Sequence, residues 1–179
     1  MLTPLLFSGH MIDRPNRSKV RFPPHLIDFV TAEIVKNLRE KEPDNSYFGL
    51  AGAGCGGDII FHESCLSLGI QSQIYLPKNP VDFKSESVSY AGEQWSQRFD
   101  TLLERISFKV LNIDENTSTE KNLWEHTNSW MIDDAMKMGR TEFVLLALWN
   151  DEQGDGKGGT ADMVSLCNSL KQKVRIISI

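Results

Sequence analysis

Short apolar runs alternate with longer stretches of helical spacing along most of the chain, and this alternation constrains the fold more than any other feature. Six runs have the length and composition of strands, at residues 3–8, 47–51, 72–76, 107–111, 143–149 and 173–179. Strands that alternate with helical segments typically form a parallel sheet covered by helices. The sequence therefore predicts the α/β class: a Rossmann-like three-layer fold with a mostly parallel sheet of about six strands.

Helical spacing predicts five helices between these strands, at residues 25–40, 58–68, around 95–103, 120–138 and 160–170. The expected inward positions are Leu26, Phe29, Val30, Ile34 and Leu38 in the first helix and Leu123, Trp124, Trp130, Met131 and Met138 in the fourth. Residues 78–90 are polar and irregular, so we expect a loop there. Because the chain has no internal repeat and no clear boundary, residues 1–179 are expected to form one domain.

The charge balance argues against a protein that binds nucleic acid through bulk phosphate contacts. The chain has 19 Lys and Arg against 24 Asp and Glu, a net charge of −5, whereas such proteins are basic. Three cysteines without metal-site spacing indicate reduced thiols in a cytoplasmic protein. The first residues lack the basic start of a signal peptide, and no apolar run approaches the roughly 18 residues that cross a bilayer. We therefore expect a cytoplasmic protein without membrane contact.

Glycine-bearing turns follow three of the predicted strands. They are Ser8-Gly9-His10, Gly52-Ala53-Gly54-Cys55-Gly56-Gly57-Asp58 and Gly154-Asp155-Gly156-Lys157-Gly158-Gly159-Thr160. The carboxyl ends of parallel strands meet at one edge, where backbone N–H groups and helix N-termini bind ligands. A single turn of this kind is often rich in glycine for steric reasons alone. Three of them on one edge favour a ligand-binding site.

The turns depart from the established cofactor and metal signatures. Gly52, Gly54 and Gly57 have the spacing Gly-x-Gly-x-x-Gly, but no acidic residue ends the next strand, which argues against NAD binding. Lys157 lacks the following Ser or Thr of a P-loop. Acidic residues between 151 and 162 fit a calcium loop only superficially, and the histidines have no metal-ligand spacing. We therefore expect no metal ion and no specific cofactor. These signatures leave a nucleotide-type ligand open as an alternative.

Basic and nucleophilic side chains near these turns are further candidates. Arg14, Arg17 and Arg21 lie in a Pro-flanked loop after the first turn, and the planar guanidinium suits phosphate. This loop is either a lid over a nucleotide or a solvated surface loop. His10 lies in a ligand-facing turn. Cys55 would be a nucleophile if a helix N-terminus lowered its pKa, but without a nearby His in the sequence a small buried turn residue is the favoured interpretation.

These turns together resemble the SLOG superfamily, the Rossmannoid fold shared by DprA, the LOG-type nucleotide phosphoribohydrolases and several nucleotide-sensing modules. Residues 49–58, Gly-Leu-Ala-Gly-Ala-Gly-Cys-Gly-Gly-Asp, and the helix that follows to Gly69 are similar to the DprA pattern of strand, Ser-Gly-Gly-Ala turn, Gly-Ile-Asp and helix. Asn128-Ser129-Trp130-Met131 resembles the Arg-Asn-Arg helix start of the family. Gly156-Lys157-Gly158-Gly159-Thr160 resembles the LOG turn Pro-Gly-Gly-x-Gly-Thr. The resemblance covers most of the chain and implies a nucleotide ligand.

The sequence also departs from the catalytic members of this superfamily. LOG-type phosphoribohydrolases carry a catalytic Glu three residues after the Thr of that turn, and Met163 stands at this position. A thioether cannot act as a general acid or stabilise a ribosyl cation. The DNA-binding members use basic surfaces and additional domains, which this acidic chain lacks. The resemblance therefore implies a nucleotide-binding module of the kind that is fused to signalling or defence effectors.

The first functional hypothesis is a ligand sensor that holds a nucleotide or a nucleotide-derived small molecule. Phosphates would bind the N–H groups of residues 54–57 and 158–160, an arginine would close over them, and Asp58 would cap its helix and bind a ribose hydroxyl. The candidate ligand-binding residues are Ser8, Gly9, His10, Arg14, Arg17, Gly52, Ala53, Gly54, Cys55, Gly56, Gly57, Asp58, Asn128, Gly158, Gly159 and Thr160.

Two alternatives remain open. The chain could be a hydrolase of nucleotide N-glycosidic bonds, with Asp58, Glu63 or Asp162 supplying the carboxylate in place of the missing Glu. It could also be an interaction scaffold with an empty site, which would neither bind nor turn over a nucleotide. Self-association into a homo-oligomer and fusion to an effector domain are compatible with each of these functions.

Overall fold

A computed structural model describes residues 2–40, 46–112, 120–139, 141–152 and 157–179, and it contains a six-stranded, all-parallel sheet. The strands are β1 (Leu2–Gly9), β2 (Ser46–Ala51), β3 (Ser72–Leu76), β4 (Phe108–Val110), β5 (Val144–Trp149) and β6 (Lys173–Ser178). The helices are α1 (Ile27–Arg39), α2 (Gly57–Ser67), α3 (Pro80–Ser87), α4 (Glu93–Arg105), α5 (Glu120–Met138) and α6 (Thr160–Ser169). The predicted fold class, a Rossmann-like α/β sheet, is confirmed. Gly154, Asp155 and Gly156 of the third predicted turn lie outside the described residues.

The strand order is β4-β3-β2-β1-β5-β6, and this order creates a crevice at one edge of the sheet. From β1 the chain builds outward in one direction to β2, β3 and β4, whereas β5 returns to the other side of β1. The loops after β1 and β5 therefore diverge from adjacent strand ends. In open parallel sheets, ligands bind at such a switch point, outside the carboxyl ends of the strands.

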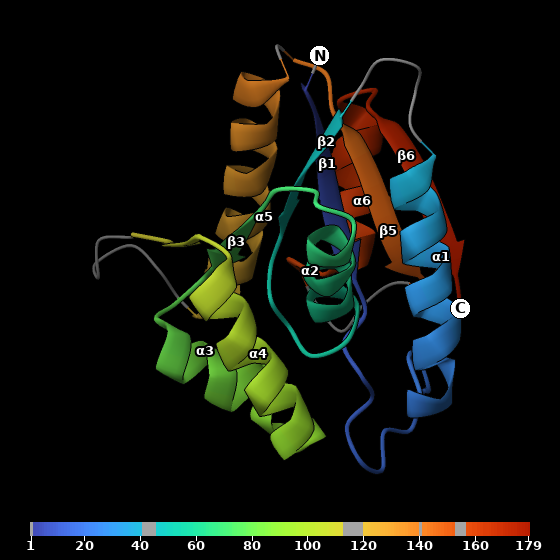
Figure 1. Ribbon diagram of the computed structural model, residues 1–179, viewed down its shortest axis with the longest axis vertical. Helices are drawn as coiled ribbons and strands as arrows, with labels where there is room; N and C mark the ends of the chain where they lie inside the picture. Colours follow the sequence, from blue (N-terminus) through green and yellow to red (C-terminus); the bar gives the residue numbers. More distant parts are fainter. Residues whose placement is uncertain (1, 41–45, 113–119, 140, 153–156) are drawn as a thin grey trace.

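Helices cover both faces of the sheet (Figure 1), and each face has its own apolar core. α1, α2, α3 and α4 pack on one face, and α5 and α6 pack on the other. Side chains of β1 alternate between the two cores, with Leu5 and Phe7 on the α2 side and Leu6 on the α5 side. This period of two is the pattern of a strand buried on both faces. It explains why β1 and β5 read as continuous apolar runs.

The first two turns pack closely against one another because glycine leaves room for the neighbouring chain. Gly56 has a φ of 120°, and an added Cβ would lie 2.8 Å from the backbone nitrogen of Ile12. Phe7 and Phe61 stack beneath this contact with ring centroids 4.7 Å apart. Glycine is required at position 56 for steric reasons, because a side chain there would separate the two loops.

The expectation of a loop at residues 78–90 is wrong, because α3 forms there. Asn79 begins this helix by accepting a hydrogen bond from the backbone N–H of Asp82 at 3.0 Å, and Pro80 occupies the first turn. Phe83 is its buried contact, 5.8 Å from the ring of Phe99 and 5.9 Å from that of Trp124. A helix of eight residues with so few apolar positions has too weak a periodic signal to be predicted.

Two predicted core positions are also wrong. Phe29 in α1 is 49% exposed and Met138 at the end of α5 is 38% exposed. Phe29 lies in the first turn of α1, and Met138 is the last residue of α5. None of the described helices is both long enough and apolar enough to span a bilayer.

Candidate ligand-binding cleft

Loops from three strands converge at the switch point between β1 and β5. The backbone N–H of His10 donates to the carbonyl of Leu148 at 3.2 Å, which extends the β1–β5 pairing by one residue. The carbonyl of His10 accepts a hydrogen bond from the N–H of Gly57 at 3.1 Å, which attaches the start of α2. Ser8 Oγ donates to Thr160 Oγ1 at 3.4 Å, which brings in the start of α6. The sequence-predicted meeting of the glycine turns is therefore present in the structure.

Two adjoining hollows open at this point. The inner chamber has a volume of about 150 Å³ and lies between the end of β1, the second turn and α5. The outer hollow has a volume of about 330 Å³ and lies under the loop that follows β1. Both hollows are lined by Gly9, Met11, Trp124, Gly158, Gly159 and Thr160, so they form one cleft with a narrow and a wide part.

Asp58 is the acidic side chain that lines the inner chamber among the described residues. Its carboxylate accepts a hydrogen bond from the N–H of Gly54 at 3.2 Å. Burial raises the pKa of the Asp58 carboxyl from 3.8 to about 7, although hydrogen bonds from the backbone of Gly54 and Gly9 oppose the rise. The chamber therefore holds a carboxyl group that exchanges its proton near neutral pH.

Asn128 faces the same chamber from α5. The residue is only 6% exposed, and its side-chain nitrogen Nδ2 has no hydrogen-bond partner in the structure. A buried amide nitrogen without a partner lowers stability, and such groups in folded proteins call for an explanation. The neighbouring Thr127, by contrast, is satisfied by donating to the carbonyl of Leu123 at 2.8 Å.

The other walls of the inner chamber are aromatic and apolar. Trp124, Phe83 and Tyr75 come from α5, α3 and β3, and Met131 and Pro77 complete the lining. Tyr75 is held in place because its hydroxyl donates to Asp134 at 2.9 Å. An apolar pocket with a few convergent polar groups is the usual form of a small-molecule site.

The outer hollow is strongly basic. Arg14, Arg17, Arg21 and Lys157 all line it. Arg14 is fixed by a hydrogen bond from its Nη2 to the carbonyl of Glu86 at 2.9 Å and by the ring of Tyr90, 3.9 Å below its guanidinium carbon. Tyr90 in turn donates its hydroxyl hydrogen to the carbonyl of Ile12 at 2.7 Å. Arg17 also pairs with Asp13 at 3.6 Å and Lys157 with Glu125 at 3.8 Å, but no acidic side chain among the described residues lines the hollow itself. The lining is therefore basic in a chain whose net charge is −5.

Three of the four N–H groups of residues 54–57 have acceptors within the protein. Gly54 donates to Asp58, Cys55 donates to the carbonyl of Ser87 at 3.0 Å, and Gly57 donates to the carbonyl of His10. These three groups are therefore not available to a phosphate, which argues against the predicted phosphate contacts of Gly54, Cys55 and Gly57. The ionised Asp58 carboxylate beside this turn would also repel a phosphate.

The third turn differs from the second in its surroundings. Gly158 donates to Asp162 Oδ2 at 3.0 Å, and no side chain caps the N-terminus of α6 at Gly159, as is also true of α2 at Gly56. The first N–H groups of a helix need a partner, and a bound anion is a common one. This helix end borders the basic outer hollow. An anion there would contact the helix N-terminus and the arginines together.

Most of the predicted site residues line the cleft. The inner chamber includes Ser8, Gly9, Gly52, Gly54, Asp58, Asn128, Gly158, Gly159 and Thr160, and the outer hollow adds His10, Arg14 and Arg17. Ala53, Cys55, Gly56 and Gly57 line neither hollow and are buried residues of the second turn. The match of Asn128 to a helix start is wrong, because this residue lies in the middle of α5.

Cys55, His62 and His10 are buried in and beside the turns, and their surroundings are those of structural residues. Burial raises the pKa of the Cys55 thiol, which opposes formation of a reactive thiolate. His62 bonds to the carbonyl of Gly52 and to Ser72 Oγ, both at 2.9 Å, and burial lowers its pKa to about 4. The neutral ring therefore links α2 to β2 and β3. His10 also has a lowered pKa because of burial, and its Nε2 pairs with Asn150 Oδ1 at 2.9 Å.

The three carboxylates proposed for hydrolysis have separate positions. Glu63 forms a two-point ion pair with Arg98, at 2.8 and 2.6 Å, outside the cleft. Asp162 is bonded to the N–H of Gly158 and lines neither hollow. Met163, at the position of the catalytic Glu of the LOG-type enzymes, is fully buried in the core between α6 and the sheet. Asp58 is left as the single carboxylate of the three that reaches the chamber.

Sequence reasoning missed several lining residues that come from segments distant in the chain. They include Met11, Tyr75, Phe83, Ser87, Tyr90, Trp124, Thr127 and Met131. Trp124 lines both hollows, but nothing in the sequence distinguishes it from the other three tryptophans. No local pattern indicates these residues, because their place depends on how α3 and α5 pack beside the second turn.

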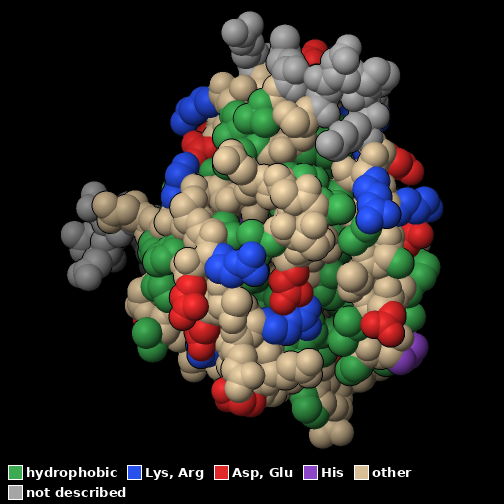
Figure 2. Space-filling view, in the orientation of Figure 1, with side chains coloured by type: hydrophobic (Ala, Val, Ile, Leu, Met, Phe, Trp, Pro, Cys, Tyr) green, Lys and Arg blue, Asp and Glu red, His purple; other side chains and the backbone are tan. Residues whose placement is uncertain are grey.

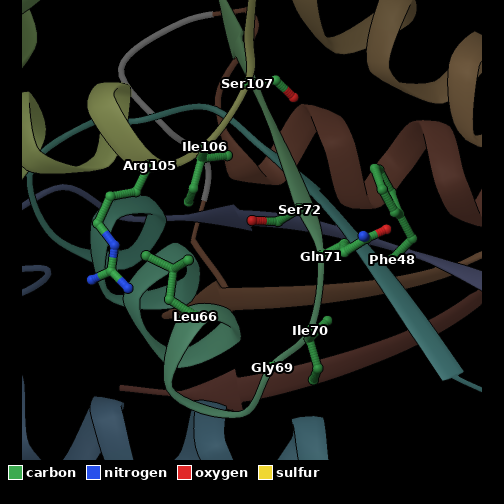
Figure 3. Close-up of a pocket in the computed structure, with 9 residues that line it drawn as sticks. All are labelled: Phe48, Leu66, Gly69, Ile70, Gln71, Ser72, Arg105, Ile106 and Ser107. Atoms are coloured by element: carbon green, nitrogen blue, oxygen red, sulfur yellow. The ribbon is translucent and has the colours of Figure 1, made fainter.

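A larger hollow of about 470 Å³ lies at the opposite edge of the sheet, where β3 and β4 begin (Figure 3). Leu66, Ile70, Gln71, Ser72, Arg105 and Ile106 are among its lining residues. None of the buried polar atoms without a partner in the described part of the chain lies in it. Elsewhere, acidic and basic side chains lie interspersed on the face shown in Figure 2. The cleft at the switch point therefore remains the candidate site.

No group of three His, Cys, Asp or Glu within the described residues could hold a metal ion.

Comparison with known proteins identifies the fold and no more. No family model and no curated protein matches the sequence. The X-ray structure of TM1055, a structural genomics target, is similar with a TM-score of 0.52 and 16% identity, over 96% of this chain and 72% of that one. A Moco carrier protein from Chlamydomonas reinhardtii has a TM-score of 0.45 and 12% identity, over 99% of this chain and 76% of that one. The similarity to TM1055 agrees with the Rossmann-like architecture.

Proposed function

We propose that this protein binds a nucleotide or a nucleotide-derived small molecule in the cleft between the ends of β1 and β5, as a sensor rather than an enzyme. The observation that carries the proposal is the outer hollow. Four basic side chains, Arg14, Arg17, Arg21 and Lys157, line it together with the uncapped N-terminus of α6. The helix dipole, the open N–H groups and the guanidinium groups all favour a phosphate there.

The organic part of the ligand has a fitting environment beside the phosphate position. The inner chamber shares six lining residues with the outer hollow and is walled by aromatic side chains. A phosphorylated molecule with an attached ring would therefore fill both parts of the cleft. A free inorganic phosphate would leave the apolar part empty.

A binding role is favoured over catalysis because the cleft has few groups that could do chemistry. Met163 replaces the acid of the LOG-type enzymes and is buried, and Glu63 is paired with Arg98. Asp58 is the remaining carboxylate, and its pKa of about 7 is the one observation that favours the hydrolase alternative. A carboxyl group that is protonated near neutral pH could protonate a leaving base.

We also propose that the chain is a divergent member of the SLOG superfamily. The support is the resemblance of its second and third glycine turns together with the Rossmann-like sheet. Members of that superfamily occur fused to effector domains, and we propose the same context for this domain of residues 1–179. A location in the cytoplasm and reduced thiols fit this context.

The test is isothermal titration calorimetry of the full chain with adenosine, uridine and cytidine 5′-monophosphates, ADP-ribose and inorganic phosphate. We expect binding of at least one phosphorylated compound, and a ligand at one hundred times its Kd adds about 2.7 kcal/mol to the free energy of unfolding. Chromatography of the ligand after incubation then separates sensor from hydrolase. Release of free base would support the alternative, and absence of any binding would favour the scaffold.

Gly159→Asp provides the matched test of the phosphate position, because Gly159 is the N-cap of α6. Asp and Asn are both favourable N-caps, so Gly159→Asp and Gly159→Asn should both keep the melting temperature near that of the original chain. Both side chains would occupy a helix N–H group, and the added negative charge of Asp should weaken phosphate binding at least tenfold more than Asn does. Equal affinity of Gly159→Asp and the original chain would contradict the proposed position.

A further inference from the structure

The inner chamber contains two polar groups that the phosphate position leaves unused. Asn128 is more than nine-tenths buried, and its Nδ2 has no partner. The carboxyl group of Asp58 faces the same space from the start of α2. A donor without an acceptor and a carboxyl group with spare hydrogen-bonding capacity thus lie on two walls of one small cavity. A ligand that supplies the complementary groups would remove the cost of leaving them unpaired.

Charge determines which part of a ligand can enter. The basic residues Arg14, Arg17, Arg21 and Lys157 line the outer hollow and none of them lines the inner chamber. The inner chamber has a carboxyl group instead. A phosphate is therefore favoured outside and disfavoured inside, so a phosphorylated ligand enters with its uncharged end first.

Size limits that uncharged end to a single ring. The chamber has a volume of about 150 Å³, and an apolar protein cavity of about this volume takes up benzene. A fused two-ring base would need more space than the inner chamber offers. Ring walls from Trp124, Phe83 and Tyr75 suit a flat or compact ring of this size.

Building on the proposed function, we infer that the inner chamber binds an uncharged single ring of the phosphorylated ligand, with Asn128 Nδ2 donating to an acceptor on that ring and the Asp58 carboxyl group bonded to an N–H or O–H of the same ring. The two ring types with this chemistry in nucleotides are a pyrimidine base and a pentose. Asn128 and Asp58 are thus specificity-determining residues, whereas the arginines bind any phosphate.

Calorimetry at pH 7 with four probes tests this inference on the full chain. The probes are uridine 5′-monophosphate, adenosine 5′-monophosphate, ribose 5-phosphate and inorganic phosphate. A pyrimidine in the chamber predicts that the uridine nucleotide binds more tightly than the adenosine nucleotide and ribose 5-phosphate. A pentose in the chamber predicts that ribose 5-phosphate binds as tightly as both nucleotides.

Asn128→Ala separates recognition of the ring from binding of phosphate. Loss of one hydrogen bond should weaken the organic ligand about tenfold, while the affinity for inorganic phosphate stays unchanged. Ser129→Ala is the matched control, because Ser129 is the next residue of α5, is exposed and lines neither hollow. If Asn128→Ala does not fold, Asn128→Asp keeps the size of the side chain and should weaken the organic ligand by removing the amide donor.

The possible failures are distinguishable. Wild-type affinity of Asn128→Ala for the uridine nucleotide and ribose 5-phosphate would overturn the role of Asn128. Adenosine 5′-monophosphate binding more than tenfold tighter than the other probes would overturn the single-ring limit. Binding of inorganic phosphate alone would overturn the inference and leave the phosphate position intact. Absence of binding by every probe would overturn the proposed function and this inference together.

Discussion

Asp58→Asn should make the protein more stable at pH 8 and leave its stability nearly unchanged at pH 4. The folded structure raises the pKa of Asp58 from 3.8 to about 7, so the native state keeps this proton to a higher pH than the unfolded chain. Well below pH 3.8 both states are protonated and the carboxyl group costs nothing, and at pH 4 its cost is still small. As the pH rises to 7 the unfolded chain loses the proton more readily, and the native state loses stability.

The size of this effect follows from the same rise. About three pH units at 1.36 kcal/mol each set an upper limit of about 4 kcal/mol. Asp58 borders the inner chamber, where water can hydrate the ionised carboxylate, so we expect about 1–3 kcal/mol in the free energy of unfolding. Asparagine keeps an oxygen that can accept the hydrogen bond from Gly54, and it carries no charge to desolvate.

Urea unfolding of Asp58→Asn and the original chain at pH 4, 5, 6, 7 and 8 measures the difference directly. Asp162→Asn is the matched control, because Asp162 accepts the N–H of Gly158 just as Asp58 accepts that of Gly54. The control removes a carboxylate from a helix N-terminus and should lower stability by about 0.3–1 kcal/mol at pH 8. A loss of stability in Asp58→Asn at pH 8 would refute the reasoning, since it would mean that the ionised carboxylate is stabilising.

Two further predictions concern the turns. Gly158→Ala should lower the free energy of unfolding by about 1–3 kcal/mol in urea unfolding, because Gly158 has a φ of 86° and an added Cβ would lie 2.5 Å from the Cβ of Trp124. A midpoint equal to that of the original chain would contradict this. Cys55, Cys65 and Cys167 are all buried, so a thiol reagent should label them in the native state only at the rate of unfolding. Rapid labelling of one thiol at pH 7.5 would show that its surroundings are open.

The sequence was sufficient to predict the sheet because its strands carry strong local signals. β1 and β5 are continuous apolar runs, and both are buried on two faces, as such runs indicate. α3 was missed because its signals are an Asn cap, a Pro and one buried Phe83, which also occur in loops. The exposure of Phe29 was missed because helical periodicity gives a face but not how far that face is covered along its length.

Prediction of the candidate site reached the turns at the strand ends but not the aromatic walls of the chamber. Gly9, Gly54 and Gly159 were found because glycine turns follow the strands in the sequence, and the topology brings these strand ends together. Trp124 and Phe83 were not assigned to the site because α5 and α3 carry them to it through tertiary packing. Asn128 was named through a resemblance to a helix start that the structure contradicts, yet it lines the chamber from the middle of α5.

The second and third turns illustrate why equal local patterns need not have equal roles. In each of them an Asp accepts the N–H of the glycine four residues before it, Gly54 with Asp58 and Gly158 with Asp162. The second turn lies between β1, α3 and α5, so the N–H groups of Cys55 and Gly57 are occupied by neighbouring carbonyls and the carboxyl group of Asp58 has a raised pKa. The third turn borders the basic outer hollow, whereas both helix N-termini, at Gly56 and Gly159, are without a side-chain cap. In the proposed site one turn therefore faces an uncharged ring and the other faces an anion, and that difference lies in what packs around each turn rather than in its residues.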